Sequence, residues 1–328
     1  MTPTQLLRGL AGVSVLTGLV IAVGVGGGLG RPGTAVLALL WLGSLNAQVL
    51  WLEQMVLAPW LHGADPTPRP AWRTRLRAWA REVRCSSRMF GWAMPWAASA
   101  WPDRLPLRED VAPGPRGVLL IHGYLCNRGV WNGWYPWLAA HGVPWVGLDL
   151  APVFTSIDDY ADTIDAALER LRQVTGQAPL VVCHSMGGLA LRAWRQARLR
   201  QGASPAALDV RVHHVVTIGT PHRGTWLARW GRQPNAMQMR LGSRWLRTLA
   251  ESESPAWRAR FTCFYSDCDN VVFPPRRATL DGATHRLLAG RAHLDLLDDP
   301  RVRTSVLAAL GVSSDLPDAA RRGRRSEK

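Results

Sequence analysis

The chain has 328 residues and a formal net charge of +15, which is carried almost wholly by arginine because Lys328 is the only lysine. No nucleic-acid recognition motif accompanies this charge, and the five cysteines are scattered without the spacing of metal ligands. We therefore expect no nucleic-acid partner, no disulfide framework and no metal site, and the length allows one α/β domain of about 200 residues plus an additional segment.

Two long apolar runs begin the chain. Residues 9–30 and 32–52 contain no charged side chain, and only Arg31 separates them. Each run is long enough to cross a hydrocarbon core of about 30 Å as a helix. We therefore predict a transmembrane helical hairpin that anchors the protein through residues 1–62. A cleaved signal peptide and a pair of buried soluble helices are the alternatives.

The arginines around these runs predict an orientation. Only Arg31 lies in the turn between the two runs, whereas Arg8 precedes the first run and seven arginines follow the second run between residues 69 and 88. The side of a membrane that is richer in basic residues is normally the cytoplasmic one. The sequence therefore predicts an inner-membrane protein with both termini and the rest of the chain on the cytoplasmic side.

Residues 63–114 form a linker rich in arginine and tryptophan. After the proline-rich stretch 66–70, apolar side chains recur with helical spacing at Trp72, Leu76, Trp79 and Val83. Arginines lie between them, so one helical face is apolar and the other cationic. Such a helix could lie among lipid headgroups or pack on the domain that follows, and both alternatives stay open.

From residue 115 the pattern changes to short apolar strands that alternate with helices. We predict strands at residues 117–121, 144–150, 180–184, 212–218, 261–265 and 284–288. This alternation is typical of an α/β fold with a mostly parallel sheet flanked by helices. We assign residues 115–312 to this domain and residues 313–328 to a basic, disordered tail.

The central motif of the domain lies at residues 180–189. An apolar, β-branched run ends in Ser185, two glycines follow, and a helical pattern begins. A sharp turn between strand and helix lifts a serine hydroxyl clear of the sheet, which is the arrangement of a nucleophile elbow. Cys183 stands where the first glycine of G-x-S-x-G usually is, and it is small enough for the turn. A serine in a surface loop is the alternative.

Three further stretches accompany the elbow. They are Leu-Leu-Ile-His-Gly-Tyr at residues 119–124, Gly-Thr-Pro-His-Arg-Gly-Thr at residues 219–225, and a pair of C-terminal segments that hold an acid and a histidine. With these motifs, residues 115–310 resemble the α/β-hydrolase superfamily and are similar to bacterial lipases and esterases.

The resemblance implies a Ser-His-Asp triad. Ser185 would be the nucleophile, Asp269 the acid and His293 the base, in the chain order that α/β-hydrolases have. Asp267 is the alternative acid. The oxyanion hole would consist of the backbone N–H groups of Tyr124 and Met186.

The sequence also predicts two surfaces of the domain. Residues 225–257 leave room for a small lid, whose apolar inner surface would come from Trp226, Trp230, Met237, Met239 and Trp245. On the helix after the elbow, we expect a solvated cationic face formed by Arg192, Arg195, Arg198 and Arg200.

The predicted function is that of a membrane-anchored serine hydrolase, a lipase or esterase that cleaves carboxylic esters of apolar acyl chains. The reaction passes through an acyl-enzyme and requires no metal or organic cofactor. The expected partners are a lipid or other apolar ester and the membrane. A thioesterase or acyltransferase with the same triad, or a non-catalytic membrane scaffold, is the alternative.

Overall fold

Six parallel strands form the sheet of a computed structural model that describes residues 1–29, 36, 39, 43–105 and 116–313. The strand order is β2-β1-β3-β4-β5-β6. The strands are β1 (Val118–Ile121), β2 (Trp145–Gly147), β3 (Leu180–His184), β4 (His214–Ile218), β5 (Phe261–Tyr265) and β6 (Thr284–Leu287). Every neighbouring pair is parallel, so the predicted α/β fold with a parallel sheet is confirmed.

Helices cover both faces of the sheet, because side chains alternate between the faces along each strand. Val118 and Leu120 of β1 pack in one apolar core with α7 (Tyr135–Ala140) and α14 (Pro300–Leu310). Leu119 and Ile121 pack in the other with α8 (Ala161–Thr175) and α9 (Met186–Arg200). The central strands are therefore buried on both faces, as continuous apolar runs predict.

Short helices connect these elements. They are η4 (Arg128–Trp131), η5 (Ile157–Tyr160), α10 (Pro205–Asp209), η6 (Trp226–Trp230), α11 (Pro234–Gln238), α12 (Arg244–Glu251), α13 (Pro255–Arg258), η7 (Pro275–Ala278) and η8 (Asp295–Asp298). Aromatic side chains of η4, α7 and the turn between them, including Trp131, Trp134 and Tyr135, are buried and pack on the sheet.

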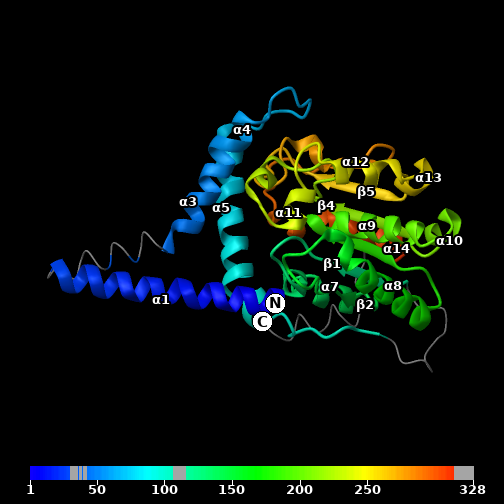
Figure 1. Ribbon diagram of the computed structural model, residues 1–328, viewed down its shortest axis with the longest axis horizontal. Coiled ribbons are helices and arrows are strands. Elements are labelled where there is room, and N and C mark those ends of the chain that lie inside the picture. Colours follow the sequence, from blue (N-terminus) through cyan, green and yellow to red (C-terminus); the bar gives the residue numbers. More distant parts are fainter. Residues whose placement is uncertain (30–35, 37–38, 40–42, 106–115, 314–328) are drawn as a thin grey trace.

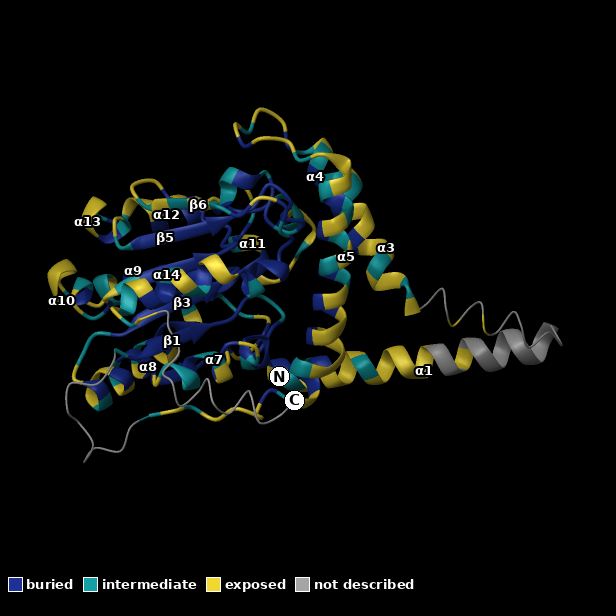
Figure 2. Ribbon diagram, turned by 180° about the vertical axis from the view of Figure 1, so that it is seen from behind, coloured by how far each residue is buried: buried dark blue, intermediate teal, exposed yellow. Residues whose placement is uncertain are grey.

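The N-terminal helices lie at one end of the sheet domain. They are α1 (Pro3–Leu29), α3 (Leu45–Trp51), η1 (Leu52–Leu57), α4 (Ala58–Trp60), α5 (Trp72–Arg88), η2 (Met89–Ala93) and α6 (Met94–Trp96). In Figure 1, α5 stands against the domain, α3 runs along the outer side of α5, and α1 starts beside the domain and projects away from it. The reverse view in Figure 2 shows the same arrangement.

The predicted transmembrane hairpin over residues 1–62 is not supported. Among the helices that the described residues form, none is both long enough and apolar enough to cross a membrane. The predicted turn at Arg31 lies outside the described residues, as does the basic tail from residue 314 onward. The cytoplasmic orientation stays a prediction.

Polar contacts hold both parts of the predicted hairpin to the rest of the protein. At the start of α1, Asn127 donates a hydrogen bond to the hydroxyl of Thr4 (3.0 Å) and Arg8 donates to the carbonyl of Pro95 (2.7 Å). After α3, the side-chain amide of Asn270 donates to the carboxylate of Glu53 (2.9 Å). Hydropathy alone could not reveal these contacts, because their partners lie far away in the sequence.

Helix α5 packs on the sheet domain with a face that the sequence did not single out. Its buried residues include Arg75, Ala78 and Glu82, whereas Trp72 is exposed. Trp79 turns toward α3, where its indole N–H donates to the carbonyl of Ala47 (2.9 Å). Of the two alternatives for this helix, packing on the following domain is therefore the one that the structure has. The predicted apolar face partly contacts α3.

The expected solvated arginine face of α9 is wrong for two of its members. Arg192 and Arg195 are each 1% exposed. Arg192 donates to both carboxylate oxygens of Glu253, at 2.6 and 2.9 Å, and Arg195 donates to Asp209 (3.0 Å). These arginines are buried because carboxylates from α10 and from the turn after α12 reach them, which a local pattern cannot predict.

We expect Glu253→Ala to lower the free energy of unfolding by about 3–5 kcal/mol, because it leaves the Arg192 guanidinium buried without its counter-charge. Urea unfolding followed by circular dichroism measures the loss. The matched control is Glu169→Ala, which removes the partner of Arg172 in a largely exposed ion pair and should cost much less. Equal losses in the two variants would contradict this account.

Candidate active site

Ser185 occupies a strained turn between β3 and α9. Its backbone has φ 52° and ψ −128°, a conformation that is rare for residues other than glycine. The two glycines that follow permit close packing beneath the turn. A Cβ at Gly187 would lie 2.5 Å from the carbonyl oxygen of Ile121, and a Cβ at Gly188 would lie 2.4 Å from the hydroxyl of Thr220. These features are those of a nucleophile elbow.

An acid and a histidine meet beyond the next strands of the sheet. His293 follows β6, and its Nδ1 lies 3.0 Å from each carboxylate oxygen of Asp269, which follows β5. The same carboxylate accepts hydrogen bonds from the backbone N–H groups of Val271 and Val272 (2.8 Å each). Asp267 accepts from the backbone N–H of Gly290 instead (2.6 Å). Asp269 is therefore the carboxylate that contacts His293.

Ser185 and His293 line the same cavity, of about 760 Å³, at the carboxyl edge of the sheet. We call this cavity the passage. Much of its wall comes from the N-terminal helices α1, α3, η1, α5 and η2, through residues that include Leu7, Leu10, Ala11, Val49, Leu50, Glu53, Glu82 and Phe90. Parallel strands end at one edge, so residues that follow different strands converge there.

The predicted oxyanion donors belong to backbone that adjoins Ser185. Met186 is the first residue of α9, so its N–H has no partner within the helix. Tyr124 follows Gly123, where a Cβ would lie only 2.7 Å from the Cβ of Ser185. The backbone that carries the Tyr124 N–H is therefore in direct contact with the serine.

The other histidines of the predicted motifs, His122, His222 and His285, have structural partners. His122 receives a hydrogen bond from the backbone N–H of Leu150 at Nε2 (2.9 Å), and its Nδ1 lies 2.8 Å from the carbonyl of Gly123. Burial lowers the pKa of His122 and, more strongly, that of His222. The Nε2 of His285 lies 2.8 Å from the carbonyl oxygen of Leu280.

Two glutamates from the N-terminal helices join the site, and the sequence analysis missed them. The carboxylate of Glu82 accepts hydrogen bonds from the backbone N–H groups of Leu294 (3.0 Å to each oxygen) and Asp295 (3.1 Å). Glu53 accepts from Asn270, whose side-chain oxygen accepts from the backbone N–H of His293 (3.2 Å). Both carboxylates therefore fix the turn that carries His293.

A weak signal for these glutamates exists in the sequence. Glu53 is the first acidic residue of the chain, and Glu82 is the only acidic residue between positions 66 and 102, among many arginines. An isolated acid in such surroundings indicates a specific partner, but no local pattern names that partner.

The charges around His293 change its proton affinity. Burial, the largest single influence, lowers the pKa of His293, but Asp269, Glu82 and Glu53 together outweigh it and raise the pKa above the usual value. Burial in turn raises the pKa of Glu82 to about 7 and raises that of Glu53. An imidazole held in this way can accept a proton from a neighbouring hydroxyl and keep it.

A second, smaller cavity of about 230 Å³ also reaches Ser185 and Tyr124. We call it the inner cavity. Its wall comes mainly from the segment predicted as a lid, through Leu227, Ala228, Ala236 and Met239, together with Pro221 and Val272.

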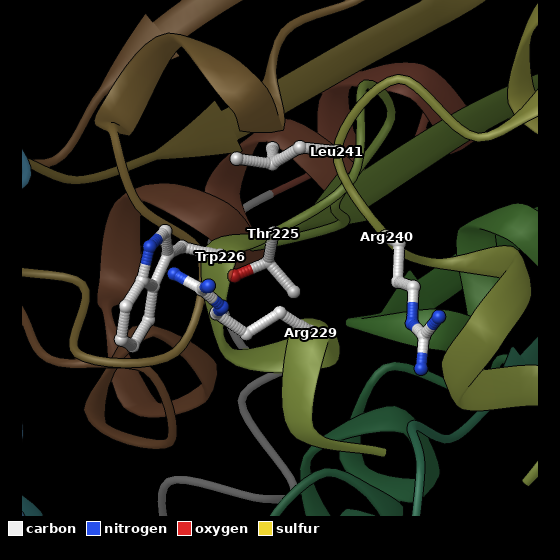
Figure 3. A pocket seen from close by; sticks show the side chains of 5 residues that line it. All are labelled: Thr225, Trp226, Arg229, Arg240 and Leu241. Carbon is white, nitrogen blue, oxygen red and sulfur yellow. The ribbon is translucent and has the colours of Figure 1, made fainter. Parts of the chain in front are cut away.

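Other residues of the predicted lid surface point elsewhere. Trp230 is 69% exposed and Met237 is 48% exposed. Trp226 and Arg229 lie together beside another hollow, with Arg240 across it (Figure 3). The expected apolar inner surface is therefore only partly correct.

Comparison with known proteins gives a family and a fold. Residues 118–326 match the model of the alpha/beta hydrolase family. Lipase B of Aspergillus fumigatus matches with TM-score 0.51 and 17% identity, over 66% of this chain and 58% of that chain. The mature lipase BlEst2 of Bacillus licheniformis matches with TM-score 0.51 and 17% identity, over 63% of this chain and 96% of that chain.

The family match covers more than half of the sequence, so the chain belongs to the alpha/beta hydrolase family. The chain spans less than two thirds of the length of the fungal lipase, and at this identity the structural likeness shows the fold. A comparison with curated proteins finds no significant match. The family match begins at β1, so the N-terminal helices that wall the passage lie outside it.

We expect Glu82→Gln to lower the pKa of His293, because it removes one of the negative charges that favour the imidazolium. NMR titration of the His293 ring resonances measures this directly. Glu251→Gln, a change of the same kind at an exposed residue of α12, should leave the pKa of His293 unchanged. A His293 pKa that is unchanged or higher in the Glu82 variant would show that the carboxylate does not act on the imidazole.

Proposed function

We propose that this chain is a serine hydrolase that cleaves carboxylic esters of apolar acyl chains through an acyl-enzyme. One observation carries the proposal: a serine in a strained elbow shares the passage with a histidine whose Nδ1 lies 3.0 Å from a buried carboxylate. Lipase B of Aspergillus fumigatus and the mature BlEst2 of Bacillus licheniformis, whose folds are similar to this chain's, are both named lipases, which agrees with this substrate class.

In this mechanism His293 takes the proton of the Ser185 hydroxyl as the oxygen attacks the ester carbonyl. Asp269 holds the Nδ1–H tautomer and stabilises the imidazolium that forms. His293 then donates the proton to the departing alcohol, and the acyl group stays on Ser185. A water molecule, deprotonated by His293, releases the acid and restores the serine.

The N–H groups of Tyr124 and Met186 stabilise the negative charge that develops on the carbonyl oxygen. Two such preorganised donors favour the transition state over the ground state, and removal of one typically costs about 2.7–4 kcal/mol. Met186 begins α9, so the positive end of that helix dipole adds to the effect.

We also propose that the enzyme works at a lipid surface, which the N-terminal helices contact. Helix α1 exposes more than half of Leu10, Val13 and Leu16 to solvent, and such apolar surface is typical of an interaction site. Leu10 also lines the passage, so the exposed apolar surface is continuous with the cavity that reaches Ser185.

The triad predicts a graded loss of activity. With p-nitrophenyl esters as substrates, Ser185→Ala should lower kcat roughly 10⁴–10⁶-fold and abolish labelling by a fluorophosphonate probe. Asp269→Asn should lower kcat about 10⁴-fold, because His293 loses the partner that fixes its tautomer.

Asp267→Asn is the matched control for the acid. Asp267 is a buried neighbour on the same turn, but it accepts a hydrogen bond from the backbone N–H of Gly290. The loss of kcat in Asp267→Asn should therefore be far smaller than in Asp269→Asn. Equal losses for the two aspartates would reject Asp269 as the triad acid. Turnover that survives Ser185→Ala would reject the serine mechanism, and inactivity of the wild type toward oxygen esters would direct the test to thioesters and acyl transfer.

Lipid binding is tested by co-sedimentation with phospholipid vesicles. We expect the double variant Val13→Asp, Leu16→Asp to lose most vesicle binding, because two charges would enter the apolar surface of α1. Val210→Asp changes an equally exposed valine after α10, at the end of the domain away from α1 (Figure 2), and should bind as the wild type does. Undiminished binding by the double variant would reject this surface.

A further inference from the structure

The passage and the inner cavity meet at Ser185, and they differ in one respect that matters for chemistry. Ser185 and Tyr124 lie in the walls of both. His293 lies in the wall of the passage, whereas the described residues that line the inner cavity do not include it. The two cavities therefore approach the serine from different sides, with the base on the side of the passage.

In the proposed ester hydrolysis, His293 delivers a proton to the alcohol part of the ester. When the Ser185 oxygen bonds to the carbonyl carbon, the bond from that carbon to the alcohol oxygen breaks. The proton that His293 took from Ser185 passes to that alcohol oxygen, so charge and atoms balance. The alcohol oxygen must then lie within hydrogen-bond reach of His293, which only the side of the passage offers.

We infer that the passage binds the alcohol part of the ester and the inner cavity binds its acyl part. This inference rests on the proposed function and adds the direction in which the substrate lies. The acyl-enzyme then holds its chain in the inner cavity, while the alcohol leaves through the passage and water enters behind it.

The walls of the passage define the class of alcohol. Leu10, Val49 and Phe90 give its outer part an apolar lining, which favours a long hydrocarbon chain. Glu53 and Glu82 lie in its wall near His293, so an anionic group next to the ester oxygen would meet two carboxylates. The passage therefore selects neutral esters of long-chain alcohols.

The inner cavity sets a limit on the acyl part. At about 230 Å³ it is far smaller than the passage, and its wall is closely packed. A Cβ at Gly231 would lie only 2.3 Å from the Cβ of Ala236, so this wall has little room to yield. The longest acyl chain that the enzyme accepts should therefore be shorter than the longest alcohol chain that it accepts.

Two ratios of kcat/KM test the assignment in the full-length protein. The acyl ratio compares p-nitrophenyl decanoate with p-nitrophenyl butyrate, and the alcohol ratio compares dodecyl butyrate with ethyl butyrate. In the wild type we expect the alcohol ratio to exceed the acyl ratio. A phosphate-bearing alcohol ester of similar length should be a poorer substrate than dodecyl butyrate.

Two substitutions fill one cavity each. Leu227→Trp narrows the inner cavity and should lower the acyl ratio about tenfold or more, with the alcohol ratio unchanged. Ala11→Trp narrows the passage and should lower the alcohol ratio by a similar factor, with the acyl ratio unchanged. Val210→Trp, at a distant exposed position, should change neither ratio. Leu227→Phe and Ala11→Phe serve as smaller changes if either tryptophan variant does not fold.

The outcomes separate this inference from the proposed function. Turnover in which Leu227→Trp lowers the alcohol ratio and Ala11→Trp lowers the acyl ratio would reverse the assignment and leave ester hydrolysis standing. Turnover in which neither ratio responds would reject both subsites. If the wild type cleaves no ester and Ser185 does not react with a fluorophosphonate, the proposed function fails and the inference fails with it.

Discussion

The buried carboxylate of Glu82 connects the two parts of this protein. It comes from α5, outside the region of the family match, and it accepts hydrogen bonds from the backbone N–H groups of Leu294 and Asp295, next to His293. A carboxylate that is 2% exposed loses much of its hydration, and these hydrogen bonds offset part of the cost. Beside it, Arg81 forms an ion pair with Asp295. The orientation of the base and the wall of the passage thus depend on the same contact.

The rest of the site follows from the geometry of a parallel sheet. Ser185, Asp269 and His293 follow three different strands, and they meet because all the strands end at one edge. The elbow adds a local constraint, since Gly187 and Gly188 leave space only for hydrogen where Ile121 and Thr220 approach. The fold thereby brings together residues that lie more than a hundred positions apart in the chain.

Local pattern was sufficient to predict the six strands and the sharp turn at Ser185, because each depends on residues close together in the sequence. It was insufficient where the partner is distant. The burial of Arg192 depends on Glu253, and the role of Glu53 depends on Asn270. Hydropathy described residues 9–52 as apolar, but it could not show that the flanking residues make polar contacts with the domain. Between Asp267 and Asp269, only the distance to His293 distinguishes the two.

The division between the family domain and the N-terminal helices has a consequence for specificity. The strands and loops of the family region supply Ser185, Asp269, His293 and the inner cavity, whereas α1, α3, η1, α5 and η2 supply most of the passage. The proposed chemistry and the proposed alcohol subsite therefore reside in separate parts of the chain. Because Glu53 and Glu82 also hold the turn of His293, a change in the packing of these helices would alter the alcohol subsite and the proton affinity of the base together.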